Sequence, residues 1–213
     1  AAYKASARLL DDQMGAVLDA LEEAGLEEDT LVICTTDHGI AFPRMKCNLT
    51  DGGIGVMLIM RGPGGFRGGQ VSEALISQAD IFPTICDLID IEVPAWVEGT
   101  SFMPVARGEV EEVNEAIFSE VNYHAAYEPQ RCVRTSRYKY IRRYGERADS
   151  TTMPNCDGGP SKKLWVEHGW KGRRVAPEQL YDLIFDPNER DNLVEDAGYQ
   201  DVLEEMRGRL RSW

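Results

Sequence analysis

The stretch Thr30–Gly39, TLVICTTDHG, decides how the fold of this chain is interpreted. Its first part, TLVICTT, is short, rich in β-branched residues and almost wholly apolar. Such a run predicts a strand that is covered on both faces, as in a parallel sheet. The stretch VMLIMRGPG (56–64) predicts a second strand of the same kind, which ends in turn residues.

Helical patterns flank the two expected strands. Apolar residues recur at helical spacing within 3–24, and Gly25 is a natural stop at the C-terminal end of that helix. The stretch SQADIFPTICDLIDIEVP (77–94) predicts another helix, with Pro83 near its start and Pro94 at its end. The order helix, strand, loop, strand, helix is typical of a layered α/β domain.

The second half of the chain has a different pattern. EAIFSEVNYH (115–124), QRCVRTSRYKYIRRYG (130–145) and QLYDLIFD (179–186) alternate apolar and polar residues. This alternation predicts antiparallel strands with one solvated face. Thr135 and Ser136 are expected to form the hairpin turn within the middle segment.

Between and after these strands, the sequence predicts less regular structure. Residues 145–178 are rich in Gly, Pro, Lys and Arg, which indicates a long loop or insertion, and a last helix is expected over about 199–211. The polar, acidic run 105–115 marks a boundary. We therefore expect an α/β core over residues 1–108 and a smaller antiparallel-sheet subdomain over residues 109–213.

The charge and the apolar content of the chain indicate which kinds of partner it can bind. The chain has 213 residues and a net charge of −13, so a nucleic-acid partner is not expected, because phosphate binding needs concentrated positive charge. No stretch reaches the roughly 18 apolar residues that would span a bilayer. Residues 131–174 nevertheless hold twelve Lys and Arg against four Asp and Glu. Such a segment can recruit a small or polymeric anion, and a solvated strand face is the alternative.

Asp37 and His38 follow directly after the first expected strand. In open α/β sheets, ligands bind at the carboxyl ends of the strands. Asp offers a hard oxygen ligand, and His offers a nitrogen ligand or a proton donor. Gly39 permits a close approach of the backbone, and the ammonium of Lys46 could reach an anion held by a metal. An ordinary turn, in which Asp37 caps local amides, fits the same spacing.

These residues carry a resemblance to a known family. LVICTTDHG, the lysine after it and DGGIGVMLIMRGPG are similar to the second metal segment of the sulfatases, within the alkaline-phosphatase superfamily. ISQADIFPTICDLIDIEVPAWVEGTSFMPVARG, RTSRYKYIRR and QLYDLIFDPNERDNLVED resemble, in order, the family's later segments. The resemblance implies the C-terminal part of an alkaline-phosphatase-like sandwich. DHGIAFPRMKCNL and the terminal RLRSW look most like the heparan N-sulfatase (sulfamidase) branch.

The resemblance implies a role for each matching position. Asp37 and His38 would be ligands of one divalent cation, which is usually calcium in sulfatases and is zinc in other members of the superfamily. Lys46 would contact the sulfate of the substrate. Three further residues stand where the sulfamidase branch approaches its substrate, and a surface loop is the alternative for them: His124, Glu128 and Arg131.

The implied reaction is hydrolysis of a sulfate ester or N-sulfate, with a sulfated small molecule or glycan as the substrate. The nucleophile of the family is a formylglycine hydrate, which is made from Cys or Ser in a C/S-x-P-x-R motif. This sequence contains no such motif. We therefore expect no catalytic nucleophile within these residues, half of a metal and sulfate site, and exposed apolar edges in the first-half sheet.

Two other functions remain open. One is a metal-dependent phosphatase or phosphodiesterase of the same superfamily, which would use two metal ions. The other is a non-catalytic fragment that binds carbohydrate. The family resemblance favours a periplasmic, secreted or lysosome-like compartment.

Overall fold

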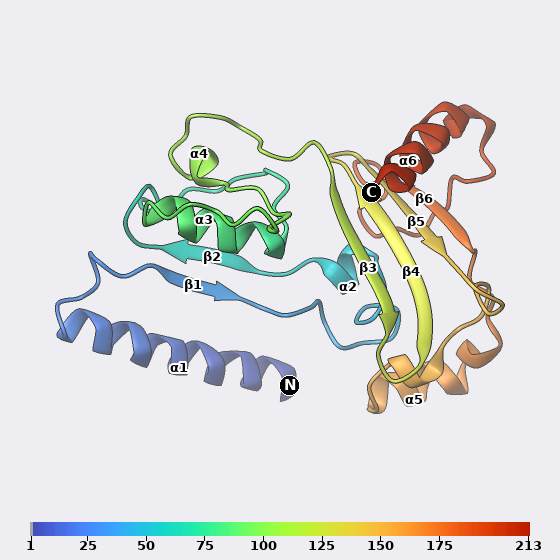
Figure 1. Cartoon of the computed structure of the whole chain (residues 1–213). Helices are drawn as coiled ribbons and strands as arrows, with labels where there is room; N and C mark the ends of the chain where they lie inside the picture. Colours follow the sequence, from blue (N-terminus) through green and yellow to red (C-terminus); the bar gives the residue numbers. More distant parts are fainter. Residues whose placement is uncertain (1) are drawn as a thin grey trace.

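The computed structural model describes residues 2–213, which form two groups of elements (Figure 1). The first group contains α1 (Ala2–Glu23), β1 (Val32–Thr35), β2 (Leu58–Arg61), the 3-10 turn η1 (Gln78–Asp80), α3 (Ile81–Leu88) and α4 (Met103–Ala106). The second contains β3 (Ile117–Tyr123), β4 (Tyr127–Arg134), β5 (Tyr138–Arg143), η2 (Met153–Asn155), α5 (Pro160–Glu167), η3 (Trp170–Gly172), β6 (Glu178–Asp182), η4 (Ala197–Tyr199) and α6 (Gln200–Ser212). This is the α/β architecture that the sequence predicts. The expected division at residue 108 stays a prediction.

The pairing of β1 with β2 differs from the expectation of a parallel sheet. The two strands are antiparallel, with Val32 opposite Arg61 and Thr35 opposite Leu58. Parallel neighbours need a crossover connection, usually a long helix, and the chain between these strands holds only the four-residue helix α2 (Asp51–Ile54). Neither strand is buried on both faces, since exposed and half-buried residues alternate along β2.

The helix expected over 77–94 is present but shorter. Ser77 caps η1 in a reciprocal arrangement with Asp80, and α3 continues to Leu88. Asp90 has a positive φ of 57°, which a helix cannot contain, so the chain leaves the helix before Pro94. The buried carboxylate of Asp80 also accepts a hydrogen bond from the backbone N–H of Thr100 at 2.8 Å.

The second half forms a four-stranded antiparallel sheet in the order β3-β4-β5-β6, as the alternation predicts. The β4–β5 turn begins at Thr135, whose backbone N–H donates to the carbonyl of Tyr138 at 2.8 Å. The expected solvated face is wrong, however, because β5 and β6 are largely buried on both faces.

Two layers explain this burial. On one face, α6 packs Leu203, Met206 and Leu210 against Val133 and Leu180 of the sheet. On the other face, the loop that precedes α2 packs Leu49 against Cys132, Ile141 and Tyr181. Figure 1 shows α2 beside this sheet, although it lies between β1 and β2 in the sequence. A loop of the first half therefore covers the sheet of the second half.

The expected long loop over 145–178 is only partly irregular. It contains α5, η2 and η3 as well as the turns between them. Pro160 occupies the first position of α5, where its missing N–H costs no helical hydrogen bond. Within residues 2–213, none of the helices is long and apolar enough to cross a membrane.

Candidate functional site

Asp37 and His38 lie on the loop that leaves β1 after Thr35. This loop is folded against α2, since the backbone N–H of Gly39 donates to the carbonyl of Gly53 at 2.8 Å. A Cβ atom at position 39 would lie well inside van der Waals contact of the Gly52 carbonyl oxygen. Glycine is therefore needed at position 39 for backbone packing, and α2 anchors the backbone that carries the two side chains.

The side chains of Asp37 and His38 face each other. Oδ2 of Asp37 lies 3.5 Å from Nε2 of His38. Nδ1 of His38 lies 2.7 Å from the carbonyl oxygen of Gly39, which can only accept a hydrogen bond. Nδ1 therefore carries the proton in the neutral ring, and the lone pair of Nε2 is left for a metal or an acid. Adjacent ligands of one Ca²⁺ ion at about 2.4 Å lie about 3.4 Å apart, so the spacing suits shared coordination.

Lys46 follows on the same loop. Its backbone N–H donates to the carbonyl of Ile40 at 3.1 Å, which closes the loop on itself. Its ammonium lies 3.0 Å from Oδ2 of Asp157. The hydrogen bond from Lys46 lowers the pKa of the Asp157 carboxyl group, and the nearby His38 and His124 contribute in the same direction. Asp157 therefore belongs to the same cluster.

A hollow of about 360 Å³ collects these groups, since its lining includes Asp37, His38, Lys46 and His124. The first three come from the loop after β1, and His124 comes from the turn that joins β3 to β4. Four of the six residues singled out from the sequence thus surround one cavity. Because His124 is far from the other three in the sequence, only the fold brings it to them.

Asn155 fixes the turn that carries His124. Its Oδ1 accepts hydrogen bonds from the backbone N–H groups of Ala125 and Ala126, at 3.0 and 2.7 Å. Its Nδ2 donates to the carbonyl of Ala126 at 3.1 Å. One asparagine therefore holds the His124 turn against the segment that carries Asp157.

Glu128 and Arg131 lie outside the lining of this hollow. Oε1 of Glu128 pairs with the buried Arg143 at 2.7 Å, and its Oε2 accepts from Asn155 at 2.7 Å. Arg131 pairs with Glu120 at 2.9 Å. Both side chains are engaged within the protein, and their part in substrate binding stays a prediction.

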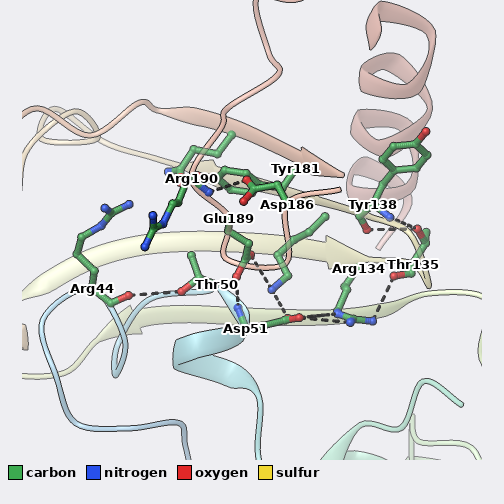
Figure 2. A network of polar contacts seen from close by, with 12 residues as sticks. Arg44, Thr50, Asp51, Arg134, Thr135, Tyr138, Tyr181, Asp186, Glu189 and Arg190 are labelled. Carbon is green, nitrogen blue, oxygen red and sulfur yellow. Dashed lines mark hydrogen bonds and ion pairs between the residues drawn. The ribbon is translucent and has the colours of Figure 1, made fainter. Parts of the chain in front are cut away.

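A buried polar network holds the loop against the sheet (Figure 2). The ammonium of Lys139, on β5, is fully buried and pairs with Asp51 at the start of α2. It also lies 3.0 Å from Oε1 of Glu189, whose other oxygen accepts from the backbone N–H of Asp51 at 2.5 Å. Arg134 adds a second cation, at 3.2 Å from Asp51. Burial raises the pKa of the Glu189 carboxyl, although Lys139 partly opposes this.

The sequence pattern does not reveal Asp157 or Lys139 as important. Asp157 stands 111 positions after Lys46, in a segment without a metal-ligand or catalytic motif. Lys139 alternates with two tyrosines on an expected solvated strand, so it is interpreted as a surface residue. Nothing short of the three-dimensional contacts would have identified either one.

Within residues 2–213, there is no cluster of three or more His, Cys, Asp or Glu side chains that could hold a metal ion. Asp37 and His38 alone offer one carboxylate oxygen and one imidazole nitrogen. These donors fit a divalent cation in type and spacing, but they amount to a partial ligand set.

Comparison with known proteins gives consistent results. The family described as Sulfatase matches residues 1–91. An ulvan-active sulfatase of Formosa agariphila is 30% identical over 91% of this chain and 39% of its own length. The N-sulphoglucosamine sulphohydrolase of Homo sapiens is 29% identical over 96% of this chain and 45% of its own length.

Solved structures show the same similarity. A 2-O glycosaminoglycan sulfatase matches with a TM-score of 0.73 at 29% identity, over 95% of this chain and 40% of its own. A phosphonate monoester hydrolase of Agrobacterium radiobacter matches with a TM-score of 0.68 at 27% identity, over 95% of this chain and 38% of its own. The chain spans about two fifths of the length of the proteins that it matches.

Proposed function

This chain belongs to the sulfatase family, and from that premise we propose that it forms part of a hydrolase for sulfate esters or N-sulfates. The observation that carries the proposal is the hollow that collects Asp37, His38, Lys46 and His124. An ammonium beside a pair of potential metal ligands is the arrangement that binding of a sulfate on a cation requires. His124 also lines the hollow, where it would contact the group that carries the sulfate.

We propose that Asp37 and His38 hold one divalent cation, with calcium as the expected ion. The oxygen of Asp37 suits calcium, and the imidazole of His38 is also compatible with zinc. When bound, the cation would stabilise negative charge on the sulfuryl oxygens. The carbonyl of Gly39 keeps Nε2 of the neutral His38 ring free for the ion, and α2 anchors the backbone beside both ligands.

For the substrate, we propose a sulfated glycan. The relatives support this class, because their names refer to ulvan, N-sulphoglucosamine and glycosaminoglycan. The family resemblance also supports a periplasmic, secreted or lysosome-like compartment. A formylglycine nucleophile would have to come from outside these 213 residues, since the sequence holds no C/S-x-P-x-R motif.

Titrations of the purified chain with Ca²⁺ and with inorganic sulfate test this site. Two ligands predict weak calcium binding, with a dissociation constant on the order of millimolar, because tight sites need more charged oxygens. Asp37→Asn is expected to weaken calcium binding by about tenfold, and Lys46→Gln to weaken sulfate binding by a similar factor.

Asp12→Asn and Lys163→Gln are the matched controls, because both residues are exposed and lie outside the hollow. Unchanged affinities in the Asp37 and Lys46 variants would overturn the assignment of the site. We expect no turnover of an aryl sulfate by this chain, and measurable turnover would show that a nucleophile lies within it.

A phosphate or phosphonate hydrolase is the second candidate, and the match to a phosphonate monoester hydrolase favours it. Such an enzyme would bind two metal ions and would bind phosphonate in preference to sulfate. Competition between methylphosphonate and sulfate for the Lys46 site, together with the metal content, separates the two. Binding of a glycan with no preference for sulfate or for phosphonate would favour a non-catalytic carbohydrate-binding role.

A further inference from the structure

A second cavity, of about 330 Å³, lies on the other side of the Lys46 loop. Residues Lys46, Asn48 and Leu49 line both this cavity and the hollow described above. The loop is thus a shared wall, and its far side faces β4, β5, β6 and the segment before β6. Lys46 therefore borders both cavities.

The rim of the second cavity is basic. Arg44, Arg173 and Arg174 line it and are exposed. Among the lining residues the only acidic one is Glu128, which is already paired with Arg143 at 2.7 Å. Within residues 2–213, Arg44 and Arg173 have no carboxylate within 4.0 Å. In Figure 2 the guanidinium group of Arg44 extends away from Asp51 and Glu189.

Most of the basic residues of segment 131–174 form ion pairs with carboxylates, and Arg174 at the rim is one of them. Eight of these twelve residues form such pairs: Arg131, Arg134, Arg137, Lys139, Arg142, Arg143, Lys163 and Arg174. The segment is therefore not a uniform patch for polyanions. Of its basic residues that have no such pair within residues 2–213, Arg173 lies at the cavity rim, where Arg44 joins it from outside the segment.

The inner walls of the cavity suit a sugar. Trp170 is buried and lines it, and the ring of Trp165 packs edge-to-face on Trp170 at 5.7 Å. The guanidinium of Arg173 lies 5.8 Å from the centre of the Trp165 ring, which restrains it at the rim. The floor is formed by buried polar side chains such as Gln130 and Gln179. An aromatic wall, a polar floor and a cationic rim are the groups that bind an acidic saccharide.

We propose that this cavity is an accessory subsite, which binds a second sulfate or carboxylate group of the same glycan whose sulfate lies beside Lys46. This inference rests on the proposed function and adds a substrate class to it: oligosaccharides with anionic groups on neighbouring sugars. Arg44 and Arg173 are the principal contacts. Arg174 contributes although it also pairs with Asp149.

The test uses the purified chain and a triple variant, Arg44→Gln, Arg173→Gln and Arg174→Gln. Titrations with a heparin-derived tetrasaccharide, with a monosulfated glucosamine and with inorganic sulfate give three affinities. We expect the triple variant to bind the tetrasaccharide at least about tenfold more weakly and with a smaller dependence on salt. Its affinities for monosulfated glucosamine and inorganic sulfate should stay within about twofold of those of the unaltered chain.

A charge-matched variant, Lys4→Gln, Arg8→Gln and Arg211→Gln, removes three exposed cations outside the cavity. An equal loss of tetrasaccharide binding in this control would overturn the subsite, because the effect would then be one of net charge. Unchanged tetrasaccharide binding in the cavity variant would also overturn it. Failure of the proposed function has a different signature, since Lys46→Gln would then leave inorganic sulfate binding unchanged.

Discussion

Lys139 has a fully buried ammonium, and its two carboxylate partners come from distant parts of the chain. Asp51 starts the helix that supports the candidate metal ligands, and Glu189 lies in the segment after β6. A buried ion pair of this kind adds little net stability compared with an apolar side chain of similar size. Removing one charge of the pair, however, leaves the opposite charge buried without a partner, which is costly. The main effect of the pair is therefore to determine where α2 sits on the sheet.

The variant Lys139→Met should lose about 3–5 kcal/mol of stability at pH 7, because Glu189 would be left buried without a cation. The urea midpoint measures this loss. Burial already raises the pKa of Glu189 above its ordinary value of 4.5. An acid with a raised pKa in the folded state costs stability above its ordinary pKa, so the deficit should shrink as the pH falls toward about 4.5 and should be smallest below that pH.

Two companion variants make the Lys139 prediction specific. Lys163→Met removes an ammonium that is 80% exposed and should change stability by less than about 0.5 kcal/mol. Adding Glu189→Gln to Lys139→Met should recover part of the loss. A stability equal to that of the unaltered chain in Lys139→Met would contradict the role given to the network.

Some residues of the site could be identified from the sequence, whereas others are identified only by contacts between distant parts of the chain. Asp37, His38 and Lys46 could be singled out because their chemistry is contained in one short stretch that follows a strand. The pairing of Lys46 with Asp157 could not, because it joins positions 111 apart. The burial of Lys139 could not be foreseen either, since an alternating strand does not show what covers its polar face.

At the scale of elements, the loop between β1 and α2 is held by the close approach of Gly39 to Gly52. Gly39→Ala should therefore displace the loop and cost about 1–3 kcal/mol, with weaker calcium binding at Asp37 and His38. Urea denaturation and the calcium titration measure the two effects. Gly158→Ala is the control, since a Cβ there meets no atom within 4 Å. An unaltered calcium affinity in Gly39→Ala would argue against the loop as the support of the site.

The contact between β6 and α6 depends on Glu178. Burial raises its pKa, but hydrogen bonds from Arg207 and Tyr140 outweigh burial and lower the pKa to about 2. Because this value lies below the ordinary 4.5, the carboxylate stabilises the fold above pH 4.5, and that contribution is lost as the pH falls toward 2.

Glu178→Gln should thus lower stability at pH 7 by on the order of 2 kcal/mol, as expected for charged hydrogen bonds. The difference from the unaltered chain should disappear near pH 2, and urea midpoints at several pH values would show this convergence. Glu167→Gln, at a side chain that is 56% exposed, should follow the unaltered chain throughout. A constant difference at all pH values would contradict the assigned pKa.

The sequence pattern predicts the positions of the helices and strands better than it predicts which of their faces are buried. The first and last helices and the strands of the second sheet occur close to where the sequence predicts them. Two predictions were wrong. β2 is antiparallel to β1, where a parallel sheet was expected, and the four-stranded sheet is covered on both faces, where one solvated face was expected. Both depend on the loop 36–57, which returns without a crossover helix and then lies on a distant sheet.

At the scale of the whole molecule, the two halves differ in how much apolar surface they cover. The second half has a core beneath α6, whereas α1 has no buried residue among those described. Leu9, Leu10 and Val17 of α1 are 59%, 53% and 69% exposed, and Ile59 of β2 is 59% exposed. Apolar surface of this extent in an isolated chain favours association.

The purified chain should therefore bind a hydrophobic dye and associate as its concentration rises, which dye fluorescence and sedimentation velocity would show. Leu9→Lys, Leu10→Lys and Val17→Lys together should reduce both effects while the urea midpoint stays nearly constant, because these side chains make little buried contact. Val71→Lys, at an isolated apolar residue that is 89% exposed, should change neither. Association that is unchanged in the α1 variant would show that this exposed face does not cause it, and a large fall in the midpoint would show that the helix contributes to the folded core.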